Sequence, residues 1–465
     1  MPAWPLNKLV RTPLLILGIV ETLILFSSVY FAGLVMFGDI DNSERILGPL
    51  MPRALVVAAV ILVSLVAMGL YQFHQRIYFR EAIARVFVGV GMGGIALGVI
   101  FYGVPAVSLT RDFALLAFAY ALCLLLLVRF YFVRSVDENI FRRKTLIYGA
   151  GERAASIADL RRRADRRGFK VVGQIPAPGD TNMGEQSKVL PKDRSIADMA
   201  AELDAEEIVV AMDDRRGNLP VRELLDCRLR GIEVIDLLEF LERETGKIWV
   251  DLVQPGWLIF SPGFRVSKMR YFNKRLVDFA ASFALVLIAW PLMLLIALAI
   301  KAEDGIRQPV FYRQRRVGRN NHVFNVLKFR SMRVDAEADG QAVWASADDA
   351  RVTRVGSILR KLRLDELPQI LNVLRGQMSL VGPRPERPEF VDSLKESIPY
   401  YAERHTVNPG VTGWAQLRYS YGANEEDALE KLQFDLYYVK NQSLLLDLMI
   451  ILQTVEVVLW GKGAR

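Results

Sequence analysis

The chain has 465 residues, of which 52% are hydrophobic and 24% are charged. This length favours two or three domains, and a mean hydropathy of +0.23 indicates membrane segments beside soluble parts. The formal net charge is +8, and the cations cluster beside the apolar segments, which favours an anionic lipid or a phosphorylated substrate over nucleic acid. Two cysteines and three scattered histidines exclude a disulfide framework and argue against a zinc site.

Four apolar runs predict a four-helix transmembrane bundle over residues 1–140. Each run has about 19–25 residues, enough to cross a hydrocarbon core of roughly 30 Å. The runs cover residues 13–37, 54–73, 86–104 and 113–133. Glu21 lies inside the first run and is expected to face the other helices as a structural residue. The alternative is a functional intramembrane carboxylate.

Basic residues in alternate loops predict the orientation of this bundle. Arg80 and Arg85 precede the third run, and Arg142, Arg143 and Lys144 follow the fourth. Because basic loops are retained on the cytoplasmic side, we expect the N-terminus and everything after the fourth run to be cytoplasmic.

Residues 141–245 predict an α/β domain of Rossmann-like type, because short apolar strands alternate with helical stretches. The first strand leads into Gly149-x-Gly151-x-x-Ala154, the start of a dinucleotide-binding fingerprint. No acidic residue follows the second strand, which ends near Gln174, so NAD is not expected. Gly149 and Gly151 remain candidates for nucleotide binding, although a structural or regulatory role is favoured.

A linker is assigned to residues 246–266, and a second apolar run covers residues 276–300. Basic residues flank this run on both sides: Lys268, Arg270, Lys274, Arg275, Lys301, Arg307 and Arg313. Both ends therefore favour the cytoplasmic side. Trp290 and Pro291 lie near its middle, where a proline bends a helix. We expect a re-entrant helix that breaks at these two residues. The alternative is an ordinary span with a proline kink.

An acidic pair, Asp365 and Glu366, lies at the centre of a basic segment. The surrounding cations are Lys328, Arg330, Arg360, Lys361, Arg363, Arg375 and Arg384. This pattern suits a phosphate-bearing substrate, while the carboxylates can hold a metal, attack phosphorus or manage a proton. Leucine and isoleucine residues at helical spacing predict that a short helix begins near Asp365. The alternative is a helix cap followed by a first-turn glutamate.

Four motifs follow one another in this part of the chain: K-F-R-S-M, L-D-E-L-P-Q, S-L-V-G-P-R-P and P-G-V-T-G-W-A-Q. Together they closely resemble the bacterial sugar transferase family, the monotopic phosphoglycosyl transferases or polyprenyl glycosylphosphotransferases. The resemblance implies an α-rich catalytic domain over residues 267–465 with a re-entrant membrane helix. The family usually has Ser-Pro at the break of that helix, where this chain has Trp290-Pro291. The whole layout resembles the long, exopolysaccharide-initiating members.

The resemblance implies that a sugar-1-phosphate passes from a UDP-sugar to polyprenyl (undecaprenyl) phosphate. The reaction would occur at the cytoplasmic face of the bacterial inner membrane and start exopolysaccharide or capsule repeat units. Asp365 matches the catalytic aspartate, which implies an aspartyl-phosphosugar intermediate, and Glu366 would assist. Mg²⁺ is the implied cofactor, with Asp365 and Glu366 as its ligands. The candidates for substrate binding are Lys328, Arg330, Arg360, Arg384 and Arg316.

Two other functions stay open. The chain could be a membrane-bound nucleotide-sensing protein, although the C-terminal motifs argue against this function. It could be an NAD-dependent sugar-modifying protein, although the missing acidic residue argues against that one. The sequence does not identify the sugar, and it is compatible with a homo-oligomer.

Overall fold

The structure is a computed structural model, and the chain divides into two compact units that are described separately. The main segment of one unit is Met1–Gly246 and that of the other is Lys247–Val457. The structure describes residues 12–71, 79–135, 142–160, 165–166, 168–180, 189–191, 194–215, 218–253, 255–261, 263–264, 267–333, 351–419 and 424–460.

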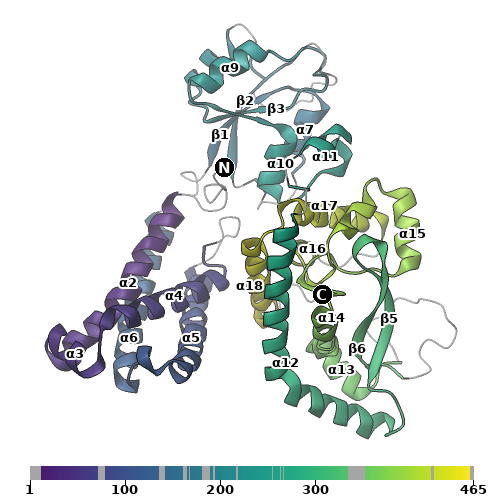
Figure 1. The fold of residues 1–465 in the computed structure, drawn as a ribbon. Coiled ribbons are helices and arrows are strands. Elements are labelled where there is room, and N and C mark those ends of the chain that lie inside the picture. Colours follow the sequence, from purple (N-terminus) through teal and green to yellow (C-terminus); the bar gives the residue numbers. More distant parts are fainter. Residues whose placement is uncertain are drawn as a thin grey trace. The chain divides into compact units, whose positions relative to one another are not determined.

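Long apolar helices form the first part of the N-terminal unit (Figure 1). They are α2 (Thr12–Phe37), α4 (Leu50–Ala67), α5 (Phe79–Gly103) and α6 (Arg111–Ser135). α2 packs against α4 and α6, and α5 packs against the same two helices. Each has a segment of at least 18 residues with a mean hydropathy of 2.0 or more, as membrane-spanning helices require. The short helices α3 (Ile40–Leu47) and η1 (Pro105–Val107) lie in two of the connections.

α4 begins and ends earlier than its hydropathy predicts, at Leu50 and Ala67 instead of residues 54 and 73. Gly69 has a φ of 69°, a left-handed conformation that ends a helix and favours glycine. Arg85 donates a hydrogen bond to the carbonyl oxygen of Met68, at 3.0 Å. The helix therefore ends where a backbone turn and an arginine from another helix take over its terminal carbonyl groups.

Glu21 is fully buried among these helices, as expected for a structural residue. Its carboxylate accepts hydrogen bonds from Arg129 Nε at 2.5 Å and Nη2 at 2.9 Å, and from the hydroxyl of Tyr71. Because removing one partner of a buried ion pair leaves an uncompensated charge, this cluster fixes how α2 and α6 face each other.

The second part of the N-terminal unit is an α/β domain with a parallel four-stranded sheet in the order β2-β1-β3-β4. Its strands are β1 (Arg143–Tyr148), β2 (Phe169–Ile175), β3 (Glu207–Val210) and β4 (Glu233–Asp236). Its helices are α7 (Glu152–Ala158), α8 (Ile196–Glu202), α9 (Val221–Leu229) and α10 (Leu237–Thr245). The predicted alternation of strands and helices is confirmed. Buried side chains such as Leu146, Ile208 and Met199 form its core.

The C-terminal unit contains one long helix, α12 (Lys268–Asp304). The elements before and after it are η3 (Val250–Leu252), α11 (Pro255–Phe260), β5 (Phe311–Val317), η4 (Arg319–Asn321), β6 (Val323–Phe329), α13 (Arg354–Lys361), η5 (Leu364–Glu366) and α14 (Gln369–Leu374). The remaining elements are β7 (Ser379–Val381), α15 (Pro388–Ser397), η6 (Tyr401–Thr406), β8 (Gly410–Thr412), α16 (Trp414–Arg418), α17 (Glu425–Asn441) and α18 (Leu444–Trp460).

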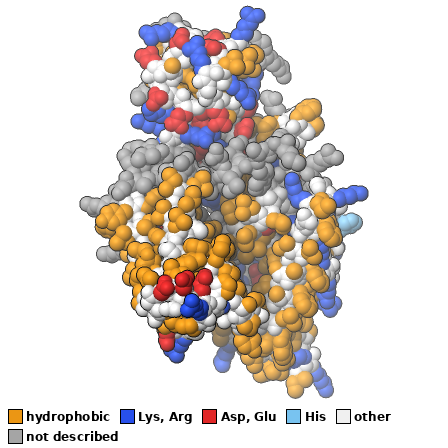
Figure 2. All heavy atoms as spheres, turned by 60° about the vertical axis from the view of Figure 1, so that its left-hand side comes forward, with side chains coloured by type: hydrophobic (Ala, Val, Ile, Leu, Met, Phe, Trp, Pro, Cys, Tyr) orange, Lys and Arg blue, Asp and Glu red, His pale blue; other side chains and the backbone are white. Residues whose placement is uncertain are grey.

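α12 is apolar and largely uncovered by the rest of its unit. Its mean hydropathy reaches 2.8, and only 11% of its most apolar segment is buried. In Figure 2 hydrophobic side chains cover much of the surface of the helical parts, whereas the α/β domain at the top shows mixed charges. An exposed apolar helix of this length requires a hydrocarbon environment, so the chain is a membrane protein with an α/β region.

The predicted break at Trp290 and Pro291 takes the form of a bend, not an interruption. α12 is one continuous helix from Lys268 to Asp304, with Pro291 inside it. Figure 1 shows that the ribbon of α12 changes direction sharply along its length. A proline inside a helix removes one backbone hydrogen bond and is the commonest cause of such a bend. Trp290 is 56% exposed on the apolar surface of the helix.

Candidate active site

The acidic pair lies in η5, a single 3₁₀ turn that precedes α14. Hydrogen bonds join Glu366 N to the Arg363 carbonyl at 3.4 Å and Leu367 N to the Leu364 carbonyl at 3.2 Å. Arg363 begins the turn with a φ of 57°, a left-handed conformation that is uncommon for residues other than glycine. A helical segment therefore begins near Asp365, as predicted, but its first turn is a 3₁₀ turn, and the α-helix α14 begins only at Gln369.

Glu366 binds two of the predicted substrate-binding cations. Its Oε1 accepts hydrogen bonds from Lys328 Nζ at 3.0 Å and from Arg384 Nη2 at 3.2 Å. Lys328 lies on β6, and Arg384 lies in the loop after β7. Burial alone would raise the pKa of Glu366, but Arg384 and Lys328 outweigh it and lower its pKa to about 2. Glu366 is therefore ionised throughout the physiological pH range and holds both cations in place.

Asp365 has the opposite electrostatic environment. It is half-buried, and burial raises the pKa of its carboxyl above the usual value. The negative charge of Glu366 raises this pKa further, while Lys328 and Arg363 oppose the rise. A carboxylate with a raised pKa is more basic, and it can act as a nucleophile or receive a cation. The two adjacent carboxylates therefore differ in pKa: Glu366 is held ionised by its cations, whereas Asp365 is the more basic group.

The other predicted cations lie at different places around the pair. Arg316, on β5, donates to Glu386 Oε2 at 3.4 Å and to Gln314 Oε1 at 2.7 Å. Arg330 directly follows β6, and its backbone N–H donates to the carbonyl oxygen of Val310 at 2.9 Å. Its Nη1 is buried and has no hydrogen-bond partner in the described part of the chain.

Arg360 is half-buried in the last turn of α13, the helix that packs against η5. It forms no ion pair with any residue for which the structure gives a position. The structure thus brings Lys328 and Arg384 directly to the acidic pair. Arg316, Arg330 and Arg360 are carried by elements that adjoin this site.

A buried ion pair that sequence reasoning missed supports the loop of Arg384. Arg404, in η6, donates from Nη2 to Asp435 Oδ2 at 2.7 Å, and both side chains are almost completely buried. The same Nη2 donates to the Arg384 carbonyl at 3.0 Å. The N–H of Val317 binds the Glu386 carbonyl at 2.9 Å from the other side. The loop is therefore fixed by contacts from residues far away in the sequence.

Asn372 was also missed, and it fixes β6 relative to α14. It is completely buried. Its Oδ1 accepts the N–H of Leu327 at 2.9 Å, and its Nδ2 donates to the Asn325 carbonyl at 2.8 Å and to Gln377 Oε1 at 2.9 Å. The available signal was an asparagine within the apolar run L-P-Q-I-L-N-V-L, where a buried amide needs partners.

The P-G-V-T-G-W motif is built into the same framework. β8, which contains Gly410, pairs in parallel with β7, and β7 leads directly to the Arg384 loop. A Cβ on Gly410 would lie 2.1 Å from the backbone nitrogen of Gly382. Glycine is needed because the two backbones approach too closely for any side chain.

The glycines of the α/β domain are explained by close packing. Gly149 has a φ of 126°, and a Cβ there would lie 2.4 Å from the carbonyl oxygen of Ala211. A Cβ on Gly151 would lie 1.9 Å from Oδ2 of Asp213. Gly149 therefore requires glycine without any bound nucleotide, and a side chain at position 151 would displace the Asp213 carboxylate.

The N–H groups of this glycine loop bind carboxylates of the chain itself. Asp213 accepts hydrogen bonds from Glu152 N at 3.1 Å and Arg153 N at 2.8 Å. Asp180 accepts one from Ala150 N at 2.7 Å. In the dinucleotide-binding fingerprint such N–H groups face phosphates. Here they are occupied, which favours a structural role for this loop.

These features define a class of protein: a membrane-associated chain with an α/β region and a basic site centred on two carboxylates. Residues 269–461 match the family model described as "Bacterial sugar transferase". The chain is 30% identical over 440 residues to the "UDP-glucose:undecaprenyl-phosphate glucose-1-phosphate transferase" of Xanthomonas campestris pv. campestris, which covers 90% of this chain and 89% of the relative. The chain belongs to the bacterial sugar transferase family.

Two further relatives match shorter parts of their length. The "UDP-N-acetylgalactosamine-undecaprenyl-phosphate N-acetylgalactosaminephosphotransferase" of Aeromonas hydrophila is 44% identical over 247 residues, 52% of this chain and 56% of the relative. The "Undecaprenyl-phosphate glucose phosphotransferase" of Komagataeibacter xylinus is 35% identical over 329 residues, 69% of this chain and 60% of the relative. The chain thus matches little more than half of the length of these two relatives.

Proposed function

We propose that the protein transfers a sugar-1-phosphate from a UDP-sugar to undecaprenyl phosphate and thereby starts the assembly of exopolysaccharide or capsule repeat units. The single observation that carries this proposal is the difference between the two carboxylates. Glu366 stays ionised and holds Lys328 and Arg384, while the pKa of Asp365 is raised by burial and by Glu366. The names of the relatives, which refer to undecaprenyl phosphate, support the choice of acceptor.

In the first proposed step, a carboxylate oxygen of Asp365 attacks the phosphorus that carries the sugar. A bond forms between this oxygen and phosphorus, the bond from phosphorus to the bridging oxygen breaks, and UMP leaves with the electron pair. In the second step an oxygen of undecaprenyl phosphate attacks the same phosphorus and releases the Asp365 carboxylate. Lys328 and Arg384 lie beside the pair and would neutralise charge on the phosphates.

Mg²⁺ is proposed as the cofactor, and the residues present fit it. Glu366 Oε1 is bound by two cations, so Asp365 is the carboxylate better placed to contact a metal. Mg²⁺ needs few protein ligands when a substrate supplies phosphate oxygens. When bound, it would withdraw charge from the diphosphate. Glu366 would then act mainly by positioning Lys328 and Arg384.

The proposed setting is the cytoplasmic face of the bacterial inner membrane. The basic flanks of α12 and the bend in this helix support a re-entrant helix that enters and leaves on one side. The four apolar helices before the α/β domain would form a transmembrane bundle. The α/β domain would have a structural or regulatory role. Its strand order is Rossmann-like, and N–H groups of its glycine loop already bind carboxylates of the chain.

The direct test is the release of UMP by the purified full chain with undecaprenyl phosphate, Mg²⁺ and a panel of UDP-sugars. We expect release with one or a few of these sugars and its loss in Asp365→Asn. Trapping with radiolabelled UDP-sugar in the absence of acceptor should leave the label on the wild-type chain. Asp392→Asn, which changes an exposed aspartate on α15, is the matched control. Turnover at the wild-type rate by Asp365→Asn would overturn the proposal.

A further inference from the structure

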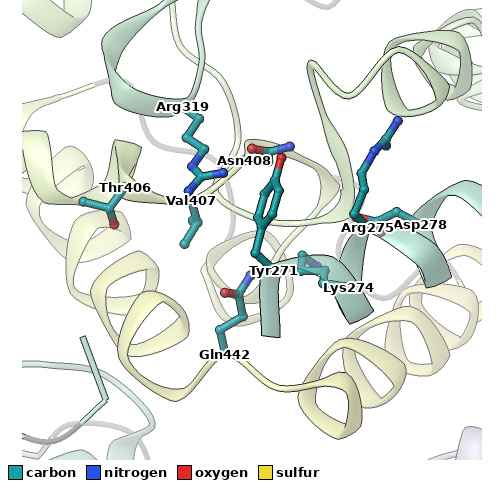
Figure 3. A pocket seen from close by; sticks show the side chains of 9 residues that line it. All are labelled: Tyr271, Lys274, Arg275, Asp278, Arg319, Thr406, Val407, Asn408 and Gln442. Atoms are coloured by element: carbon teal, nitrogen blue, oxygen red, sulfur yellow. The ribbon is translucent and has the colours of Figure 1, made fainter. Parts of the chain in front are cut away.

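A cavity in the C-terminal unit lies apart from the acidic pair (Figure 3). It is partly open, and its empty space, open solvent included, is about 320 Å³. Its lining comes from α12, from Arg319 of η4, from the end of η6 with the two residues after it, and from Gln442 after α17. Arg275 of α12 donates to the carbonyl oxygen of Leu374, at 2.6 Å, which places the cavity at the C-terminal end of α14. η5 adjoins the other end of this helix, and the six residues of α14 rise roughly 9 Å. The cavity is therefore distinct from the proposed catalytic site.

Most charged groups that line the cavity are bound to partners within the unit. Lys274 Nζ donates to Asp447 Oδ2 at 2.6 Å. Asp278 Oδ1 accepts a hydrogen bond from the backbone N–H of Leu380, in β7, at 3.1 Å. Arg275 binds carbonyl oxygens at the end of α14. The positive charge left for a ligand is therefore mainly that of Arg319.

Arg319 is held by an aromatic ring and has one N–H group that is available to donate a hydrogen bond to a ligand. Its guanidinium lies 4.3 Å from the ring centroid of Tyr271, as in a cation–π pair. Its Nε is buried and has no hydrogen-bond partner in the part of the chain that the structure describes. Figure 3 shows the two side chains facing each other in the cavity. A buried guanidinium N–H without a partner is costly, and phosphate oxygens are well suited to bind it.

The surroundings of Tyr271 indicate a ligand that also has an apolar part. Met269, Phe272 and Leu276 lie on the same turns of α12 and are 67%, 63% and 58% exposed. Lys268 and Arg270 begin this helix with exposed side chains. Apolar side chains beside basic and aromatic ones are typical of the headgroup level of a membrane. We propose that this cavity binds the phosphate group of a membrane phospholipid, with Arg319 as the hydrogen-bond donor and Tyr271 as its support.

Native mass spectrometry of the full chain in detergent tests the proposal. Phosphatidylglycerol is titrated against the wild type, Arg319→Gln, Tyr271→Leu and the control Arg315→Gln. The control removes the same charge from an exposed side chain on the same hairpin, outside the cavity. We expect Arg319→Gln to bind about tenfold more weakly and Tyr271→Leu, which keeps the charge, about threefold more weakly. Arg315→Gln should bind as the wild type does.

Two further ligands separate the sources of the phosphate. Diacylglycerol has the same tails without phosphate, and inorganic phosphate lacks the tails. We expect the wild type and all variants to bind diacylglycerol with the same affinity. We expect millimolar inorganic phosphate to displace phosphatidylglycerol only partly. If inorganic phosphate displaced phosphatidylglycerol completely when the two ligands are at equal concentrations, the cavity would be assigned to free phosphate and the lipid assignment would be overturned. Equal affinities of Arg319→Gln and Arg315→Gln for phosphatidylglycerol would overturn the site itself.

Discussion

At the scale of single residues, two adjacent carboxylates have different pKa values because their contacts differ. Glu366 receives two cations and has a pKa of about 2, whereas burial and the charge of Glu366 raise the pKa of Asp365. The sequence predicts that both carboxylates belong to the site, but it does not determine which of them has the lowered pKa and which the raised pKa. The contacts that decide them come from β6 and from the loop after β7.

The electrostatic link between the two carboxylates gives a prediction with a sign. Attack by Asp365 requires its ionised form, so kcat/KM should fall as the pH decreases through its raised pKa. Glu366→Gln removes a negative charge that raises this pKa, and the acidic limb should therefore move to lower pH. We also expect kcat/KM at pH 8 to fall roughly ten- to hundredfold, because Lys328 and Arg384 lose their partner.

The measurement is the rate of UMP release between pH 4 and pH 9 in roughly half-unit steps, a range set by ordinary carboxyl pKa values. Glu386→Gln is the matched control, since Glu386 binds Arg316 and is not among the main causes of the raised pKa of Asp365. Its acidic limb should stay in place. An acidic limb of Glu366→Gln that moves to higher pH would contradict the assignment of the two carboxylates.

The ion pair of Arg404 and Asp435 predicts a large effect on stability. Asp435→Asn leaves a buried guanidinium without its counter-charge, which typically costs about 3–5 kcal/mol. We expect a clearly lower apparent Tm for the purified full chain in detergent. The double variant Arg404→Met, Asp435→Leu should recover much of this loss, because it removes both charges. An unchanged Tm in Asp435→Asn would mean that the pair does not stabilise the loop of Arg384.

At the scale of elements, the end of the membrane helix positions the helix before the acidic pair. Glu303, near the C-terminus of α12, accepts hydrogen bonds from Arg354 N at 2.8 Å and Val355 N at 2.9 Å. These are free N–H groups at the start of α13, where a carboxylate is favoured. α13 carries Arg360 and leads through Arg363 into η5. The membrane helix and the site are therefore mechanically connected.

Glu303→Ala should loosen α13 without unfolding the unit. The loss of a helix cap typically costs about 0.5–2 kcal/mol. We expect faster hydrogen exchange at the first amides of α13 and a several-fold higher KM for the UDP-sugar. Asp304→Ala is the control, because it removes the adjacent carboxylate, which caps no helix in the described structure. Equal exchange in both variants would show that Glu303 does not hold α13.

At the scale of the whole molecule, periodic patterns were predictable and contacts between distant segments were not. Hydropathy located the apolar helices, and the alternation of strands and helices located the parallel sheet, because both signals are local. The C-terminal end of α4 and the 3₁₀ form of η5 were missed, since the contacts made there, with Arg85 and with β6, come from other segments of the chain. The roles of Asn372 and Arg404 were also missed, because a buried polar residue is defined by partners far away in the sequence.

The orientation of the membrane segments gives the last prediction. The chain has two cysteines, Cys123 and Cys227, so a background with both changed to serine allows single cysteines to be placed at will. Asp41→Cys lies between α2 and α4, and Arg222→Cys lies in the α/β domain. Asp392→Cys lies on α15, after α12 in the chain. All three side chains are exposed.

A membrane-impermeant maleimide should label position 41 in cells whose outer membrane has been permeabilised, and positions 222 and 392 only after the inner membrane is opened. Basic residues flank α12 on both sides, so a re-entrant helix keeps positions 222 and 392 in the same compartment. A helix that crosses the bilayer would separate them. Labelling of position 392 together with position 41 would therefore put the acidic pair outside the cell, away from nucleotide sugars, and contradict both the re-entrant helix and the proposed reaction.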